Sequence, residues 1–403
     1  MPASSPGVYV VLYATLYGAF GVASPFWPRL FESRGLTPQQ IGTVLAAGLL
    51  VRLAAGPAIG RLADRSGRLR AMLSGCLVLA AATSAGLAGA QGFVLIFGIA
   101  LVQAAALAPT TSLADALAVS ADPPARRQRP FEYGWIRGGA SLAFVLGTLL
   151  AGQLIAPNDL SPAIWANAMM LFAAAVLAAA PVHASANASR PAAGSIAGAV
   201  RALMGMPPFR AVMAVSALVY GSHAMYDGFA VIRWNAAGLD ATTVSLLWSE
   251  AVGAEVVVFL LIGPRLIDRL GPRGAMALAA SAGVVRWSVF AFTDSPFVLL
   301  AVQPLHGLTF SLLHLACMRL IAGIVPVRLA ATAQSLYAFG SAMVTALLMW
   351  ASGWIYGAGS TPFLVMAALC VLALAWTGLA SRSIARCDDG GRDHGHDHGS
   401  GAS

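Results

Sequence analysis

The chain has 403 residues, of which 58% are hydrophobic and only 10% are charged. Soluble proteins carry about 25% charged residues, so this chain has too few to cover a surface that faces water. Its net charge of +8 resides in short loops rather than on one basic face, which argues against a nucleic-acid partner. We therefore expect an all-α integral membrane protein surrounded by the lipid bilayer.

The N-terminal segment, "MPASSPGVYVVLYATLYGAFGVASPFW", lacks the basic start and the small-residue cleavage site of a removable leader. We expect it to form the first membrane span. A helix needs about 20 apolar residues to cross the hydrocarbon core, and twelve stretches of the chain reach that length. Their centres lie near Leu16, Leu50, Leu79, Gln103, Phe144, Leu171, Tyr220, Ala254, Ala282, His306, Val344 and Leu369.

The arginines divide unevenly between the two sets of connecting loops. One set holds Arg61, Arg65, Arg68, Arg70, Arg126, Arg127, Arg129, Arg190, Arg201, Arg210, Arg265, Arg269, Arg273 and Arg328. The other set holds Arg29 and Arg34, with Arg233 near a helix end. Because cytoplasmic loops are enriched in basic residues, we expect both termini to lie in the cytoplasm and the chain to lie in the inner membrane.

The longest connection divides the chain into two halves of six spans each. We expect an N-terminal half at residues 1–181, a cytoplasmic linker at 182–208 and a C-terminal half at 209–381. Residues 382–403 are polar and are predicted to be a disordered cytoplasmic tail. Alternating His and Asp in this tail could chelate zinc or nickel weakly, but a solvated tail is the preferred interpretation, and we predict no metal site.

The two halves carry related loop sequences. "GRLADRSGRLR" follows the second span and "GPRLIDRLGPR" follows the eighth, so that Gly60 corresponds to Gly263 and Asp64 to Asp268. Parallel repeats of six helices are the build of one large class of transporters, whose binding site lies near the bilayer midplane between the repeats.

"GRLADRSGRLR" resembles the signature loop of the major facilitator superfamily. The resemblance implies a glycine that permits close helix packing and an aspartate that latches one conformation by pairing with a basic residue or a helix end. The residues that match are Gly60, Asp64, Arg65 and Arg68, with Asp268 and Arg269 in the second copy. The alternative interpretation is a solvated charged turn.

Five further stretches narrow the resemblance. "LADAL", "YGWIRGGAS", "GVVRW", "LHGLTF" and "HLACMR" resemble the proton symporters related to phenylpropionate permease and, more distantly, lactose permease. The similarity spans nearly the whole chain. It implies a transporter, not an enzyme, that works as a monomer without a cofactor.

Ionisable residues inside membrane spans are costly and usually mark a transport pathway. By the resemblance, Asp115 and Arg137 on the fourth and fifth spans hold substrate, although a purely structural salt bridge is the alternative. Arg52 and Arg286 complete the predicted binding set. Three arginines favour an anion, because a guanidinium can bind a carboxylate through two parallel hydrogen bonds.

The resemblance to these symporters assigns proton coupling to the tenth span. His306 lies near mid-depth, and a histidine can carry a proton at working pH; the alternative is a histidine that serves packing alone. A glutamate expected one turn later is replaced by Thr309, so the proton carrier stays open among Glu255, Asp227 and His306. Arg233 lies close to Asp227 in sequence and could neutralise it.

The repeat also pairs buried positions of opposite charge. Arg52 corresponds to Glu255, and Asp115 corresponds to Arg319. We predict that Asp115 and Arg319 approach each other when the cytoplasmic side closes and thus form a gate; the alternative is that Arg319 only marks the boundary of the membrane.

These observations predict a secondary active transporter that uses protons to move a small organic solute by alternating access. An aromatic or other small carboxylate is the favoured substrate. The alternatives are a sugar or nucleoside symporter and, less favoured, an exporter of drugs or metabolites. A membrane sensor without transport would need an attached signalling domain, for which the sequence offers no candidate beyond the short tail.

Overall fold

The computed structural model describes residues 6–120, 131–156, 159–180 and 196–392, and these are almost entirely helical. The helices of the first half are α1 (Pro6–Ala23), α2 (Trp27–Ser33), α3 (Pro38–Ser66), α4 (Leu69–Leu87), α5 (Phe93–Leu107), α6 (Thr110–Ser120), α7 (Phe131–Leu154) and α8 (Ser161–Ala179). They are followed by α9 (Ile196–Met204), α10 (Pro207–Gly221), α11 (Ala224–Ala236), α12 (Ala241–Val257), α13 (Gly263–Phe292), α14 (Pro296–Val302), α15 (Leu305–Gly307), α16 (Leu313–Ile324), α17 (Ala330–Ile355) and α18 (Thr361–Arg392). Two π-helical turns, η1 (Val258–Ile262) and η2 (Leu308–Leu312), and one 3-10 turn, η3 (Val327–Leu329), join some of them.

Every predicted span centre falls within one of these helices. Seven described helices are long and apolar enough to cross a membrane, or up to nine if each of two bent pairs counts as one span. Large apolar side chains such as Val94, Phe292 and Phe297 are exposed on the outer surface by 82%, 73% and 83%. Such exposure suits contact with lipid and would be a liability in water.

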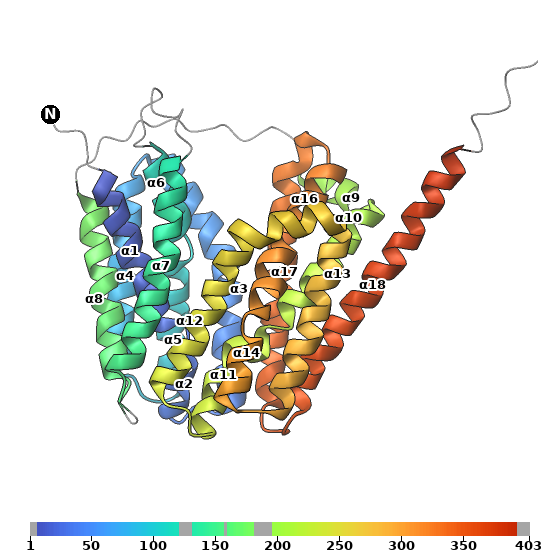
Figure 1. The fold of residues 1–403 in the computed structure, drawn as a ribbon. Coiled ribbons are helices and arrows are strands. Elements are labelled where there is room, and N and C mark those ends of the chain that lie inside the picture. The colour runs from blue at the N-terminus through green and yellow to red at the C-terminus, as the bar shows by residue number, and fades with distance from the viewer. Residues whose placement is uncertain (1–5, 121–130, 157–158, 181–195, 393–403) are drawn as a thin grey trace, which may run out of the picture.

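The helices form two bundles that lie side by side (Figure 1). In the first bundle α1 packs against α7 and α8, and α4 packs against α8. In the second bundle α13 packs against α18, and α10 against α17 and α18. Each bundle has a buried apolar cluster of its own, and a third cluster contains residues of both bundles where they join.

The bundles touch through α3 with α17 and through α7 with α12. Glycines allow these approaches: a Cβ atom on Gly42 would lie 2.9 Å from the Met349 carbonyl oxygen, and one on Gly353 would lie 2.5 Å from the Pro38 carbonyl oxygen. At the second contact, the Thr242 hydroxyl donates to the Gly152 carbonyl at 3.3 Å. All these contacts lie at the end of the molecule opposite the chain termini, and toward the termini the ribbons of the two bundles diverge (Figure 1).

The two signature loops share one backbone feature. Gly67 and Gly271 both adopt positive φ, at 63° and 68°, a conformation that L side chains rarely adopt. Gly67 ends α3, and Gly271 marks the kink within α13 where two helices meet. The sequence repeat is therefore also a repeat of backbone geometry.

Close packing at Gly60 was expected, and the structure does not bear this out. A Cβ atom on Gly60 would meet none of the described residues within 4 Å, whereas one on its repeat mate Gly263 would lie 2.7 Å from the Leu315 Cδ1 atom on α16. Close helix packing thus belongs to the second copy of the loop.

Two of the expected domain boundaries differ from the helix bounds. The linker expected at 182–208 contains α9, and α10 begins at Pro207. The tail expected from residue 382 begins inside α18, which continues to Arg392. Residues 393–403, with the His and Asp alternation, lie outside the described residues.

Candidate functional site

Three charged or titratable side chains from the second bundle form a continuous line. Arg286 on α13 lies 2.8 Å from His306 on α15, measured between Nη1 and Nδ1. His306 Nε2 lies 2.7 Å from the Glu255 Oε1 atom on α12. Arg286 is fully buried and His306 is 7% exposed, so the line begins inside the bundle. It ends at Glu255, which is half-buried.

The hydrogen-bonding capacity of arginine fixes the direction of this line. A guanidinium can only donate, so Nδ1 of His306 must accept from Arg286 and carries no proton. The proton of a neutral imidazole then lies on Nε2, which donates to the Glu255 carboxylate. The geometry therefore assigns a neutral histidine that bridges a cation and an anion.

Neighbouring groups hold Arg286 in place. Its Nη2 donates to the Gln303 side-chain oxygen at 2.8 Å. Gln303 in turn donates to the Tyr226 hydroxyl at 3.0 Å and to the Leu247 carbonyl at 2.8 Å. The guanidinium carbon also lies 4.5 Å and 4.4 Å from the ring centroids of Tyr226 and Trp287, which provides cation–π attraction.

A cavity of about 680 Å³ lies between the two bundles and reaches the exposed end of this line. The first bundle contributes Ser24, Leu49, Arg52 and Phe144 to its wall, and the second contributes residues that include Tyr226, Asp227, Trp248, Glu255, His306, Tyr337 and Thr345. Charged groups from both bundles therefore face one space near the middle of the molecule.

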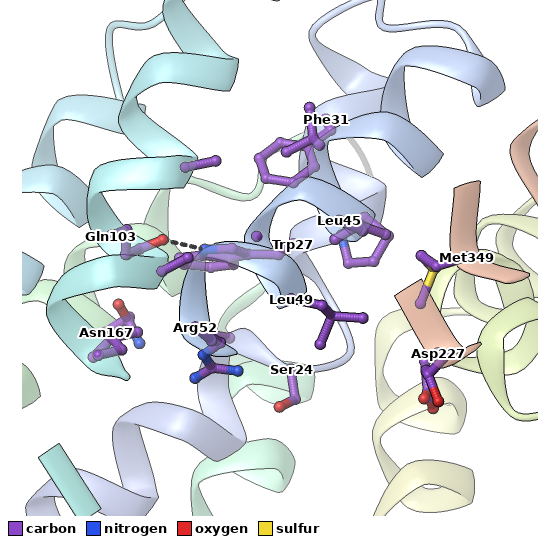
Figure 2. Close-up of a pocket in the computed structure, with 18 residues that line it drawn as sticks. Ser24, Trp27, Phe31, Leu45, Leu49, Arg52, Gln103, Asn167, Asp227 and Met349 are labelled. Carbon is purple, nitrogen blue, oxygen red and sulfur yellow. Dashed lines mark hydrogen bonds between the residues drawn. The ribbon is translucent and has the colours of Figure 1, made fainter. Parts of the chain in front are cut away.

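Arg52 on α3 and Asp227 on α11 face this space from opposite bundles. Figure 2 shows both side chains in the wall of an adjoining smaller pocket. Both side chains are exposed although they lie deep within the molecule, and the neighbours of Asp227, Tyr226 and Gly228, are buried. Neither side chain forms a hydrogen bond or ion pair with another described residue. An arginine without a protein partner at this depth is available to bind an anion.

The predicted pair of Asp115 and Arg137 lies partly outside the described residues and stays a prediction. The side chain of Arg137 lies outside them. Asp115 accepts a hydrogen bond from the Tyr13 hydroxyl and is absent from the wall of the central cavity. Arg319 is exposed and forms no ion pair with Asp115 in this conformation.

The residues of the signature loops that were predicted to form a latch are exposed. Asp64, Asp268 and their arginine neighbours Arg65, Arg68 and Arg269 are all exposed, and neither aspartate forms an ion pair with a described residue. The described residues therefore show no ion pair of the expected latch, which stays a prediction. A physical reason is that the bundles diverge toward this end of the molecule (Figure 1).

Arg233 does not neutralise Asp227, contrary to the expectation from sequence proximity. Its Nε and Nη2 atoms donate to the two carboxylate oxygens of Asp294 at 2.8 Å and 3.2 Å. Six residues along a helix place Arg233 well over one turn from Asp227, and this separation leaves Asp227 facing the cavity alone.

Sequence reasoning missed two polar residues of the site, Gln303 and His223. Gln303 lies one turn before His306 on the same helical face, so its polarity within an apolar span was the available signal. His223 Nδ1 lies 3.0 Å from the Val219 carbonyl oxygen, and its Nε2 lies 3.0 Å from the Thr309 hydroxyl. Thr309, which replaces the expected glutamate, thus bonds to a histidine, and the carboxylate partner of His306 comes from another helix.

The fold and the charged cavity between two bundles define a membrane transporter. The sequence profile of the MFS_1 like family matches residues 8–381. The chain therefore belongs to the MFS_1 like family, within the major facilitator superfamily, and its family members are transporters rather than enzymes.

Two relatives agree with this assignment, and two solved structures share the fold. The chain is 33% identical to the probable 3-phenylpropionic acid transporter of Escherichia coli (strain K12) over 90% of this chain and 94% of that one. It is 26% identical to the maltose permease of Geobacillus stearothermophilus over 82% of each chain. The fold is similar to that of the nucleoside transporter NupG, with a TM-score of 0.79, 16% identity and coverage of 93% and 98%. A bacterial homologue of the human lysosomal transporter Spinster gives a TM-score of 0.76 at 15% identity, with coverage of 94% and 97%.

Proposed function

We propose that this transporter couples the movement of protons to that of a small organic carboxylate, with an aromatic acid as the favoured substrate. The observation that carries the proposal is the free Arg52 guanidinium in the central cavity, opposite the line of Arg286, His306 and Glu255. A relative at 33% identity that is described as a probable 3-phenylpropionic acid transporter supports the same substrate class.

Arg52 is proposed to bind the carboxylate of the substrate. It faces the cavity and has no partner among the described residues, and its guanidinium matches a carboxylate in shape and charge. Arg286 is a weaker candidate, because Gln303 and His306 already occupy two of its nitrogens.

Glu255 is proposed to carry the coupled proton. Arg286 blocks Nδ1 of His306, so an added proton cannot enter there without breaking that contact. Glu255 borders the cavity and keeps a second carboxylate oxygen for a proton. A proton on Glu255 removes the negative charge that balances Arg286, and the wall then becomes more positive and favours an anion. By reciprocity the bound anion favours protonation, which couples the two ligands.

Asp227 is the alternative carrier, since it faces Arg52 across the same space. Its ionised carboxylate would oppose an anion at Arg52, and its protonation would remove that repulsion. The two carriers are distinguished by which substitution abolishes coupling.

The experiment compares Glu255→Gln with wild type in proteoliposomes, using labelled 3-phenylpropionate. We expect the variant to exchange internal for external substrate but to lose at least about tenfold of the accumulation driven by a proton gradient, because glutamine cannot release a proton. Glu250→Gln on the same helix is the matched control, because Glu250 is absent from the cavity wall. Accumulation by Glu255→Gln equal to wild type would assign the proton to another residue.

A neutral sugar or nucleoside is the second candidate substrate. It is favoured by the acid and the arginine that face each other, since Asp227 could accept and Arg52 could donate hydrogen bonds to hydroxyl groups. Uptake of a labelled panel of acids, sugars and nucleosides separates the two classes. We further propose that the termini are cytoplasmic, that the chain lies in the inner membrane and that it works as a monomer.

A further inference from the structure

A smaller pocket opens from the central cavity into the first bundle. It has a volume of about 290 Å³ and lies among α1, α2, α3 and α5. We call it the side pocket, and its wall includes Trp27, Phe31, Leu45, Gly48, Arg52, Gln103 and Ala104. The residues that border both spaces are Ser24, Leu49, Arg52, Asp227 and Thr345, so Arg52 lies where they meet.

The wall of the side pocket is largely apolar and aromatic. Trp27 presents its indole to the space, and its Nε1 donates to the Gln103 side-chain oxygen at 3.1 Å, which fixes the orientation of the ring (Figure 2). Phe31, Leu45 and Leu49 add further apolar surface. Ser24, Gln103 and Asn167 add polar atoms to this wall. Its aromatic and aliphatic side chains favour a flat apolar group.

We infer that the side pocket holds the ring of an arylalkyl carboxylate while Arg52 binds its carboxylate. The inference rests on the proposed function and adds the position and size limit of the apolar part of the substrate. An apolar cavity of about 150 Å³ is enough to bind benzene. The side pocket therefore has room for a phenyl ring and the short chain that links it to the carboxylate at Arg52.

Gly48 sets the width of the pocket. It precedes Arg52 by one helical turn, so both lie on the same face of α3. A Cβ atom on Gly48 would lie 3.6 Å from Cβ of Ala104 on α5, which is ordinary contact. Two small residues therefore adjoin each other in the wall of the side pocket. An alanine at position 48 fits without strain, whereas a leucine would fill the space that the ring needs.

The test measures uptake of labelled 3-phenylpropionate and labelled propionate by proteoliposomes, with protein-free liposomes as the blank. Both acids have the carboxylate, but only one has the ring. We expect Gly48→Leu to lower the ratio of 3-phenylpropionate to propionate uptake at least about tenfold, because loss of buried contacts worth 1–3 kcal/mol changes discrimination by roughly 10- to 200-fold. Gly75→Leu is the control and should keep the wild-type ratio, because Gly75 lies outside both cavity walls and a Cβ atom there meets none of the described residues within 4 Å.

Ala104→Leu adds a large side chain to the pocket wall from α5 instead of α3 and should lower the ratio in the same way. This second variant keeps the inference testable if Gly48→Leu does not fold, which would appear as the loss of propionate uptake as well. An unchanged ratio in a leucine variant that still transports propionate would overturn the inference and leave the proposed function standing. Wild-type protein that transports neither acid would overturn both.

Discussion

Single hydrogen bonds decide the chemistry at the scale of the residue. His306 was predicted to matter because it is a histidine in an apolar span, and the structure places it between Arg286 and Glu255. The sequence alone does not show which atom donates and which accepts in the hydrogen bonds of His306. Glu255 is 51 residues away in the chain, and which helix faces turn toward each other depends on packing, so the glutamate that bonds to His306 could not be chosen in advance.

Replacement of His306 tests whether it is a bridge or a carrier. Glutamine can accept from Arg286 through its oxygen and donate to Glu255 through its nitrogen, but it cannot be protonated at working pH. We expect His306→Gln to retain proton-driven accumulation to within about tenfold of wild type. His306→Ala should lose it, because it leaves the buried Arg286 without this contact, at a cost of about 1–3 kcal/mol. Equal loss of accumulation in both variants would indicate that His306 itself carries the coupled proton.

At the scale of the element, the apolar stretches predicted the helices well. Every predicted span centre lies in a helix, and the structure adds that Gly67 and Gly271, in the two related loops, share a positive φ. The local irregularities were not predicted: α1 and α2 meet at 43°, and π-turns interrupt two spans. These depend on contacts between helices, which hydropathy along one chain does not encode. The same limit explains why close packing was assigned to Gly60 and is found at Gly263.

The contact between α3 and α17 makes a prediction of its own. A side chain on Gly353 would collide with the Pro38 carbonyl oxygen, at 2.5 Å from Cβ, so Gly353→Val should force the bundles apart at the end opposite the termini. We expect a cysteine that replaces Ser24, in the cavity wall, to react faster with an impermeant maleimide added from that side. Gly75→Val is the control, since nothing lies within 4 Å of a Cβ atom there. Unchanged labelling would mean that this contact does not close the cavity.

At the scale of the whole molecule, the site belongs to neither bundle alone. Arg52 comes from the first bundle, and Asp227, Glu255 and Arg286 come from the second. We propose that movement of one bundle against the other changes the access to the site between them. The repeat and the family resemblance predicted this division. The count of twelve spans remains a prediction. The gate between Asp115 and Arg319 also remains a prediction, since Arg319 forms no ion pair with a described residue in this conformation.

The central claim is that carboxylate and proton cross together, and substrate-driven proton entry tests it most directly. Proteoliposomes that contain the wild-type protein are loaded with a pH-sensitive dye and prepared without a pH gradient. We then add 3-phenylpropionate outside and follow the internal pH. Protein-free liposomes measure the acidification caused by passive entry of the acid. The account predicts protein-dependent internal acidification that is absent in Arg52→Gln. Protein-dependent entry of labelled 3-phenylpropionate without acidification beyond the passive rate would contradict it.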